Sequence, residues 1–272
     1  MNDKLTIIKI GGSVITDKSK PLSVDKKLIR SLAREMDLIK KKKTIIVHGG
    51  GSFGHPIAKK YMIAEGLKNA AQIPGVAETS EAMLTLNKII VDIFLQEKFP
   101  VISFSPHDIF ITKRGRIYRS FIQPLTSILE IGLIPILFGD VVYDIIQGAA
   151  ILSGDQIISY LSTKLETERI ILGTDTDGIY SADPKKSQSA RLIPEITPEN
   201  YRKILINLRT SAANSIDVTG GMYGKVKELV KVAKHGIDIY IINAKKPGNL
   251  NRILNGFEIV CTRFKDWKTN NN

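Results

Sequence analysis

The chain has 272 residues, of which 43% are hydrophobic and 24% charged; this composition supports a packed core and excludes bulk disorder. Its formal net charge of +12 is compatible with nucleic-acid binding, with an anionic substrate or with a basic solvated surface. The lysines are spread along the chain apart from the run 40–43, and no DNA- or RNA-binding motif is present, so we expect no nucleic acid as a partner.

Strands and helices alternate in the N-terminal part of the predicted fold. Apolar runs predict strands at 5–10, 44–47 and 101–104. Helical spacing of apolar residues predicts helices at 23–41, with Ser23 as the N-cap, and at 54–65 and 76–98. The pattern then changes to two hairpins, which join 109–111 to 117–118 and 141–143 to 148–151.

The remaining elements continue the alternation. Strands are expected at 133–138, 169–172, 238–242 and 258–262. Helices are expected at 123–130, 155–167, 222–235 and 250–254. Such alternation predicts an α/β fold, a three-layer α/β/α sandwich with a central, mostly parallel sheet. We expect one domain over 1–264, followed by a frayed polar tail at 265–272.

The single cysteine, Cys261, excludes a disulfide within the chain and fits a reducing compartment. The start of the chain lacks the pattern of a signal peptide. No apolar stretch approaches the roughly 20 residues that span a bilayer. We therefore expect a cytoplasmic protein without membrane contact.

Glycine-rich turns follow the first two expected strands. Gly11-Gly12-Ser13 ends the first strand, with Lys9 two residues before it, and Gly49-Gly50-Gly51 ends the second, with Gly54-His55 shortly after. Adjacent glycines let backbone N–H groups approach an anion, and the start of a helix favours phosphate. A plain tight turn with a solvated Lys9, and a capping or surface role for His55, remain the alternatives.

Three further turns lie at the starts of helices or after strands. Ser153-Gly154-Asp155 opens a helix, where Asp155 is either functional or a simple cap. The acidic loop 174–180, continued by Asp183, is suited to a nucleotide or Mg²⁺. Gly220-Gly221 precedes Lys225 at the start of a helix, which predicts another anion site.

The sequence does not support the other common nucleotide-binding motifs, nor a zinc site. The Walker pattern is not met, because Val226 and not a hydroxyl residue follows Lys225. Residues 49–54 match G-x-G-x-x-G, but no acidic residue ends a following strand about 20 positions on, which disfavours a dinucleotide fold. The protein-kinase motifs are absent, and one cysteine with four scattered histidines offers no zinc spacing.

The order of the five motifs resembles the amino-acid-kinase family, whose members include acetylglutamate, glutamate 5-, aspartate, carbamate and uridylate kinases. The motifs are Lys9–Ser13, His48–Gly51, Ser153–Asp155, Thr174–Tyr180 and Thr219–Lys225, so the resemblance covers most of the chain. The histidine after the glycine loop, His55, and a second matching lysine, Lys18, are most similar to the branch that phosphorylates isopentenyl phosphate. Fosfomycin-resistance kinases share the histidine.

The resemblance implies an ATP-dependent kinase that uses Mg²⁺, forms a homodimer and binds the acceptor in an N-terminal lobe (about 1–165) and ATP in a C-terminal lobe (about 166–264). The implied catalytic residues are His55, Lys9, Lys18, Asp155 and Lys225, with Asp155 orienting the lysines. The implied ATP-binding residues are Lys9, Gly11, Gly12, Ser13, Gly51, Asp175, Tyr180, Asp183, Gly221 and Lys225. The implied acceptor-binding residues are Gly50, Gly54, His55 and Gly154. No metal ligand is assigned.

Three alternatives stay open beside this interpretation. The acceptor could be another anion, as in the fosfomycin, acetylglutamate or UMP kinases. The chain could instead be a nucleotide sensor, although sensing alone needs no aspartate that orients lysines. The apolar residues Met83, Leu86, Ile90 and Ile93 either line a pocket for a hydrocarbon tail or form an ordinary core stripe.

Overall fold

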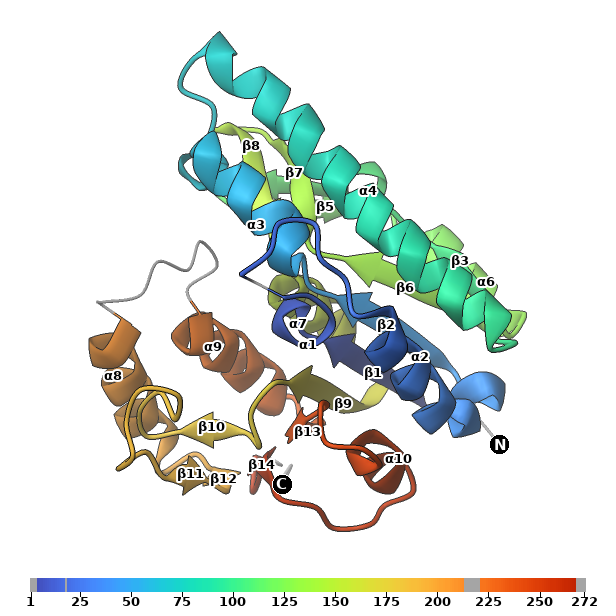
Figure 1. Ribbon diagram of the computed structural model, residues 1–272, viewed down its shortest axis with the longest axis vertical. Helices are drawn as coiled ribbons and strands as arrows, with labels where there is room; N and C mark the ends of the chain where they lie inside the picture. Colours follow the sequence, from blue (N-terminus) through green and yellow to red (C-terminus); the bar gives the residue numbers. More distant parts are fainter. Residues whose placement is uncertain (1–3, 18, 213–220, 268–272) are drawn as a thin grey trace.

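The computed structural model describes residues 4–17, 19–212 and 221–267. An eight-stranded sheet in this part of the chain has the order β12-β14-β13-β9-β1-β2-β6-β3 (Figure 1). Its strands are β1 (Leu5–Ile10), β2 (Thr44–His48), β3 (Val101–Ser103), β6 (Ile134–Phe138), β9 (Thr167–Thr174), β12 (Glu195–Ile196), β13 (Asp238–Asn243) and β14 (Cys261–Phe264). All neighbouring strands are parallel except β13 and β14. The strands before and after residue 165 form separate halves of the sheet, which meet where β1 pairs with β9.

Helices cover both faces of this sheet, as the three-layer prediction requires. The helices of the described residues are α1 (Gly12–Ile15), α2 (Lys26–Glu35), α3 (Gly51–Lys60), α4 (Ile73–Gln96), α5 (Pro106–Ile109), α6 (Gln123–Glu130), α7 (Gly154–Lys164), α8 (Tyr201–Ala212), α9 (Gly221–Ala233) and α10 (Asn249–Leu254), of which α5 packs on a second, smaller sheet. Short 3₁₀ helices lie at Asp37–Lys41, Ile63–Glu65 and Ala70–Gln72. No helix among the described residues is both long enough and apolar enough to cross a membrane.

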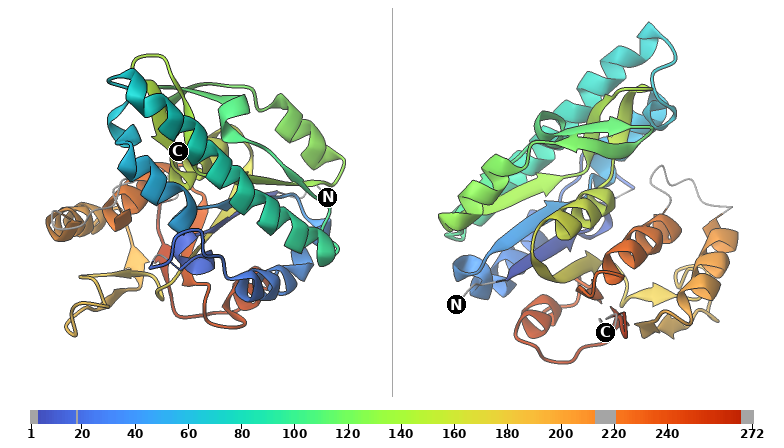
Figure 2. Two further views of the ribbon diagram at one scale, coloured as in Figure 1. Left: turned by 45° about the horizontal axis from the view of Figure 1, so that its top comes forward. Right: turned by 180° about the vertical axis from the view of Figure 1, so that it is seen from behind.

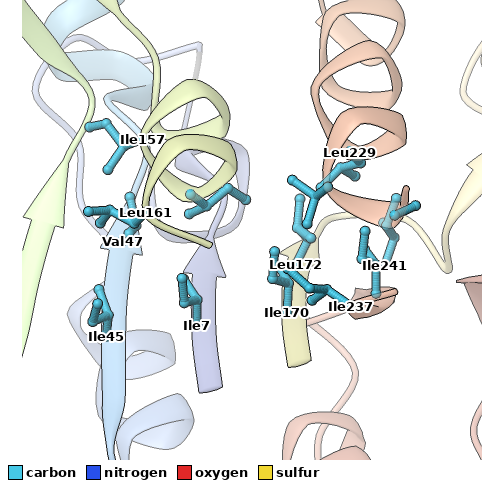
Figure 3. Close-up of a cluster of buried hydrophobic side chains, with 14 of the residues drawn as sticks. Ile7, Ile45, Val47, Ile157, Leu161, Ile170, Leu172, Leu229, Ile237 and Ile241 are labelled. Carbon is cyan, nitrogen blue, oxygen red and sulfur yellow. The ribbon is translucent and has the colours of Figure 1, made fainter. Parts of the chain in front are cut away.

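The central strands are apolar on both faces because both faces are buried. In β1, Leu5 and Ile7 belong to one hydrophobic cluster, while Ile8 and Ile10 belong to the other. The first cluster includes side chains of α7 and α9, such as Ile157 (Figure 3). The second includes side chains of α2, α4 and α10. A strand covered on both sides is therefore a continuous hydrophobic run, which is the signal that predicted β1, β2 and β6.

Both predicted hairpins are present and form one small sheet. Its order is β5-β4-β7-β8, with β4 (Phe110–Lys113), β5 (Arg116–Ser120), β7 (Asp140–Asp144) and β8 (Gly148–Leu152). The hairpins join where Thr112 of β4 pairs with Asp144 of β7. Figure 1 and the right-hand view of Figure 2 show this sheet beside α4. Strand β7 follows directly after β6, so the chain passes at Gly139 from the central sheet into this small sheet for the second time.

Several predicted boundaries were wrong. Asp25, and not Ser23, caps α2, because its carboxylate accepts the Leu28 N–H at 2.9 Å. The expected helix 23–41 is divided after Glu35, and the expected helix 155–167 ends at Lys164. Helix α3 begins three residues earlier than predicted, at Gly51.

The C-terminal third departs further from the sequence-based prediction. Helix α8 was not predicted, nor was the short antiparallel pair of β10 (Ile179–Tyr180) and β11 (Leu192–Ile193). Strand β14 lies three residues later than the predicted start at 258. The ordered chain also passes the expected boundary at 264, since Trp267 is buried and its indole N–H donates to the Ile196 carbonyl at 2.9 Å.

Candidate active site

A cavity of about 230 Å³ opens where the carboxyl ends of the parallel strands meet the first turns of the neighbouring helices. The cavity is lined by residues that directly follow strands β1, β2, β6 and β9. Residues at the starts of α7 and α9 line it as well. This is the edge at which ligands bind in open α/β sheets. The lining includes most of the predicted site: Lys9, Gly11, Gly12, Ser13, Gly50, Gly51, Gly54, His55, Gly154, Asp155, Asp175, Gly221 and Lys225.

The first two glycine turns pack backbone against backbone. A Cβ on Gly12 would lie 2.3 Å from the Gly51 nitrogen, and one on Gly49 would lie 2.7 Å from the Gly12 nitrogen. Gly51 also has a φ of +49°, and a Cβ there would lie 1.9 Å from Thr16 Oγ1. These glycines therefore have a packing role as well as leaving room for a phosphate, since only glycine permits the approach.

Thr16 joins the two turns through its hydroxyl group. Its Oγ1 donates to the Gly12 carbonyl at 2.7 Å and accepts the Ser52 N–H at 3.0 Å. Pro56 in α3 has no N–H to offer the Ser52 carbonyl, which instead accepts the Leu22 N–H at 3.3 Å. The starts of α1 and α3 are thus held at the same cavity.

Lys9, Asp155 and Lys225 form a charged cluster at one end of the cavity. Lys9 Nζ lies 2.6 Å from Asp155 Oδ1, and Lys225 Nζ lies 3.0 and 3.1 Å from the two carboxylate oxygens. Ser153 is the N-cap of α7 and forms a capping box with Gln156. Asp155 is therefore not the cap of α7; its carboxylate holds the two lysines, as the family resemblance implied.

The cluster carries excess positive charge in a buried setting. Burial lowers the pKa of Lys9 from 10.5 to about 8, with Asp155 opposing the shift and Lys225 adding to it. Burial would raise the pKa of Asp155, but the two lysines hold it well below its usual range. With both lysines protonated, two ammonium groups face one carboxylate. The arrangement suits a phosphate group, which would supply the missing negative charge.

His55 lies at the other end of the cavity, in the second turn of α3. The expected helix at 54–65 would have placed it at the helix start, which was wrong. Gly50 and Gly54 lie beside it and leave room for Met83 of α4, since a Cβ on either would lie 2.9 or 2.8 Å from the Met83 sulfur. Ala58, Met83 and Ile151 make this end of the lining largely apolar. The site thus combines an ionic end with an apolar end that carries one imidazole.

The four residues with two open interpretations divide between pocket and core. Met83 lines the cavity. The other three, Leu86, Ile90 and Ile93, are buried in the hydrophobic cluster that α4 shares with α2 and α10. A single turn of α4 therefore reaches the cavity, and the rest of the stripe is ordinary core.

The acidic loop after β9 is partly at the cavity and partly outside it. Asp175 lines the cavity, accepts the Ser13 hydroxyl at 3.1 Å and pairs with Lys185. Tyr180 is in β10 and Asp183 is exposed, where it accepts the Lys185 N–H at 2.9 Å; neither lines the cavity. Their assignment to ATP stays a prediction. Lys18 and Gly220 lie outside the described residues.

One buried carboxylate at the cavity was missed by the sequence-based prediction. Asp140 follows Gly139 at the end of β6, lines the cavity and lies 2.7 Å from His107 Nδ1 through Oδ2. Burial raises the pKa of Asp140, and the hydrogen bond to Asp140 raises the pKa of His107. The available signal was its place: Gly-Asp directly after a predicted central strand, like the glycine turns after β1 and β2.

The geometry is that of a phosphate-handling site in a doubly covered parallel sheet, and a model of the amino acid kinase family matches residues 4–243. The chain belongs to the amino acid kinase family. It is 39% identical to an isopentenyl phosphate kinase of Methanothermobacter thermautotrophicus, over 96% of this chain and 98% of that protein.

Two further comparisons agree. An isopentenyl phosphate kinase of Methanocaldococcus jannaschii is 36% identical over 93% of this chain and 95% of that protein. An X-ray structure of an isopentenyl phosphate kinase superposes with a TM-score of 0.83 at 36% identity, covering 96% of this chain and 99% of that one. The fold and family predicted from the order of the motifs are confirmed.

Proposed function

We propose that this chain transfers the γ-phosphoryl group of ATP to isopentenyl phosphate, with isopentenyl diphosphate and ADP as products. One observation carries the proposal. A single cavity holds the Lys9–Asp155–Lys225 cluster at one end and His55, with Gly50 and Gly54, at an apolar end. The isopentenyl phosphate kinases to which the chain is similar over nearly its whole length support the choice of acceptor.

Phosphoryl transfer to a phosphate acceptor requires charge neutralisation more than proton transfer. The acceptor phosphate is already an anion, so an oxygen of it can attack the γ-phosphorus without a strong general base while the bond to the ADP oxygen breaks. The approach of two such groups is opposed by about 4 kcal/mol for each pair of unit charges at 4 Å and an effective dielectric constant of 20. Lys9 and Lys225 offset that repulsion at the point of transfer.

The residues divide by ligand as the family resemblance implies. Lys9, Lys225 and Lys18 act on the transferring phosphate, and Asp155 orients the first two. Backbone groups at Gly11, Gly12, Ser13, Gly51 and Gly221 bind the ATP phosphates, and Asp175, Tyr180 and Asp183 bind the nucleoside end. Gly50, Gly54, His55 and Gly154 bind the acceptor phosphate. The acceptor thus belongs to the N-terminal lobe, while ATP has its nucleoside end in the C-terminal lobe and its phosphates at residues of both lobes.

Mg²⁺ fits this site as an ion carried by ATP. The cavity carboxylates already have partners, since Asp155 binds two lysines, Asp175 binds Ser13 and Lys185, and Asp140 binds His107. Within the described residues no group of three or more acidic, histidine or cysteine side chains is placed to hold a metal. Mg²⁺ commonly keeps its waters and the substrate phosphates as ligands, and it would supply further charge neutralisation when bound.

An acceptor panel tests the proposal directly. The purified chain is assayed for ADP release with isopentenyl phosphate, dimethylallyl phosphate, fosfomycin, UMP and acetylglutamate. We expect the highest kcat/KM with isopentenyl phosphate. A preference for fosfomycin would retain a phosphonate acceptor but reject the isoprenoid, while a preference for UMP or acetylglutamate would also reject the assignment of His55.

We further propose a cytoplasmic homodimer. Membership of the family suggests the dimer, and the single cysteine is consistent with a reducing compartment. Light scattering on the purified chain measures the oligomeric state. A monomeric mass at micromolar concentration would contradict the dimer without affecting the proposed activity.

A further inference from the structure

The cluster at the cavity depends on two helices that are distant in sequence. Asp155 lies in the first turn of α7, and Lys225 lies in the second turn of α9. The two helices pack side by side (Figure 1). One direct hydrogen bond links them further along, where the Ser159 hydroxyl donates to the Glu228 carbonyl at 3.4 Å. The Asp155–Lys225 contact therefore depends on the spacing of α7 and α9.

The turn at 114–116, which consists of the β4–β5 turn and the first residue of β5, contacts both helices next to Asp155 and Lys225. Gln156, directly after Asp155, donates from Nε2 to the Gly115 carbonyl at 2.7 Å. Arg116 donates from Nη1 and Nη2 to the two oxygens of Glu228, at 2.6 and 2.9 Å. Glu228 lies three residues after Lys225, so it is on the same side of α9. One turn of the chain is thus bonded to α7 and to α9 at once.

The turn itself has a defined shape. Its two central residues, Arg114 and Gly115, have φ values of 51° and 69°, as in a type I′ hairpin. A left-handed conformation is unfavourable for arginine, and Asp144 compensates. The fully buried Asp144 carboxylate accepts the Arg114 N–H at 3.1 Å, the Gly115 N–H at 2.7 Å and the Thr112 hydroxyl at 2.9 Å. The β7–β8 hairpin thereby holds the turn in place.

The contact with Glu228 has a fixed geometry as well as a charge. The Glu228 side chain is only 9% exposed, so its carboxylate needs a partner. Lys231 on the same helix is a second partner at 3.1 Å, but it adds no link to another element. Arg116 pairs with both oxygens of the Glu228 carboxylate. Its planar guanidinium therefore fixes the direction and the distance of the contact, which the single ammonium group of a lysine does not.

We propose that the turn at 114–116 is a positioning element for phosphoryl transfer: through Gln156 and Glu228 it holds α7 and α9 at the spacing at which Asp155 and Lys225 meet. The inference rests on the proposed function, which places those two residues at the reacting phosphate. Arg116 and Glu228 are positioning residues, because they act on the site through Lys225. Arg116 comes from the N-terminal half of the chain and Glu228 from the C-terminal half, so the contact also joins the two lobes.

The test replaces Arg116 and compares it with a matched control. Arg116→Gln should lower kcat by about ten- to a hundredfold, the effect of misplacing a reacting group by a fraction of an ångström to an ångström. The KM for isopentenyl phosphate should stay within about twofold, because the acceptor end is untouched. Arg119→Gln makes the same change on the same strand and should retain wild-type kcat, because among the described residues the Arg119 guanidinium lies over the Tyr118 ring and pairs with no carboxylate. Arg116→Lys, which keeps the charge but loses the fork, should give an intermediate kcat.

A second measurement separates positioning from general stability and from the proposed function. Amide hydrogen exchange over 221–233 should be faster in Arg116→Gln than in the wild type or Arg119→Gln, with no acceptor present. If Arg116→Gln fails to fold, the same comparisons are made with Arg116→Lys. The inference is overturned if the Arg116 variant matches the control in kcat, or if only its melting temperature falls. A wild-type chain inactive on isopentenyl phosphate would reject the proposed function, while the exchange comparison would still decide whether this turn holds α9.

Discussion

The two ends of the cavity differ in the charge and in the polarity of the side chains that line them. The end at Asp155 is ionic, and its two ammonium groups face one carboxylate, which leaves an excess of positive charge for a phosphate to balance. The end at His55 is lined by the apolar side chains of Met83 and Ile151. From this comparison we expect phosphoryl transfer and acceptor recognition to be separable in this molecule. Changes at the first end should act on kcat, and changes at the second should act on the acceptor.

The largest effect is expected at the ionic end. Asp155→Asn keeps the shape but leaves Lys9 and Lys225 without the carboxylate that orients them. We expect kcat to fall on the order of a thousandfold, as for the loss of a preorganised electrostatic group. Steady-state kinetics with isopentenyl phosphate measures this. Isothermal titration with the acceptor alone should show nearly unchanged binding, and an equal loss of binding would contradict the separation of the two ends.

The next largest effect is expected at His55. His55→Ala should lower kcat/KM for isopentenyl phosphate by about a hundredfold, since a hydrogen-bond donor at the acceptor phosphate is lost in a largely apolar surrounding. The melting temperature should stay close to that of the wild type.

The exposed His235 provides the matched control for this change. His235→Ala removes an imidazole whose hydrogen-bond partner within the described part of the chain is the Lys231 carbonyl, so it should have wild-type kinetics. Wild-type activity in His55→Ala would show that the acceptor end has been assigned wrongly.

A smaller effect is expected from pH, and it should act at the ionic end only. The Lys9 pKa of about 8 in the free protein means that the ammonium is lost as pH rises through that value, so kcat/KM for ATP should fall by up to tenfold per pH unit above it. The stability effect has the opposite sign. Between about 8 and 10.5 the unfolded chain binds more protons than the folded one, so this group makes the folded state more stable as pH rises.

Two measurements check the pH dependence. The pH profile of kcat/KM for ATP should show the fall, and the fall should disappear in Lys9→Met, whose residual kcat/KM should be flat over the same range. Urea unfolding of the wild type and of Lys9→Met gives the second comparison. The advantage of Lys9→Met in free energy of unfolding should be larger at pH 7 than at pH 10, and an equal difference at both would contradict a lowered pKa.

The smallest effect is expected from narrowing the acceptor end. Gly54→Ala would place a Cβ 2.8 Å from the Met83 sulfur. Because a thioether side chain moves readily, the KM for isopentenyl phosphate should rise by less than about tenfold, with kcat nearly unchanged. The double variant Gly54→Ala with Met83→Ala should restore part of the KM. A loss in kcat without a change in KM would show that this end also positions the transfer.

The elements that local patterns predicted well are those buried on both faces or on one clear stripe. Strand β1 and helix α6 have the predicted bounds, because every residue of β1 is buried and α6 has a regular apolar spacing. Helix α8 was missed although Ile204 and Leu208 share its buried side. Ile206 on the same helix is 65% exposed, so its apolar residues do not form a single stripe.

The position of β14 shows the other limit. The apolar run at 258–262 suggested a strand, but Val260 is 61% exposed and only the residues from Cys261 onward pair with β13. Which part of an apolar run becomes an edge strand depends on its neighbour in the sheet. A local sequence pattern does not specify which strand that neighbour is.

The sequence by itself determined the class of site, because glycines, lysines and an aspartate follow one another in an order that local chemistry explains. What only the tertiary structure decided is how they meet. Lys9 and Asp155 are 146 positions apart, and Arg116 and Glu228 are 112 apart. Pairings across such separations follow from the packing of helices on a sheet, which no local spacing encodes. The same packing explains the glycines at 12, 49 and 51: the sequence marks them as phosphate turns, and the fold shows that they also let two turns touch.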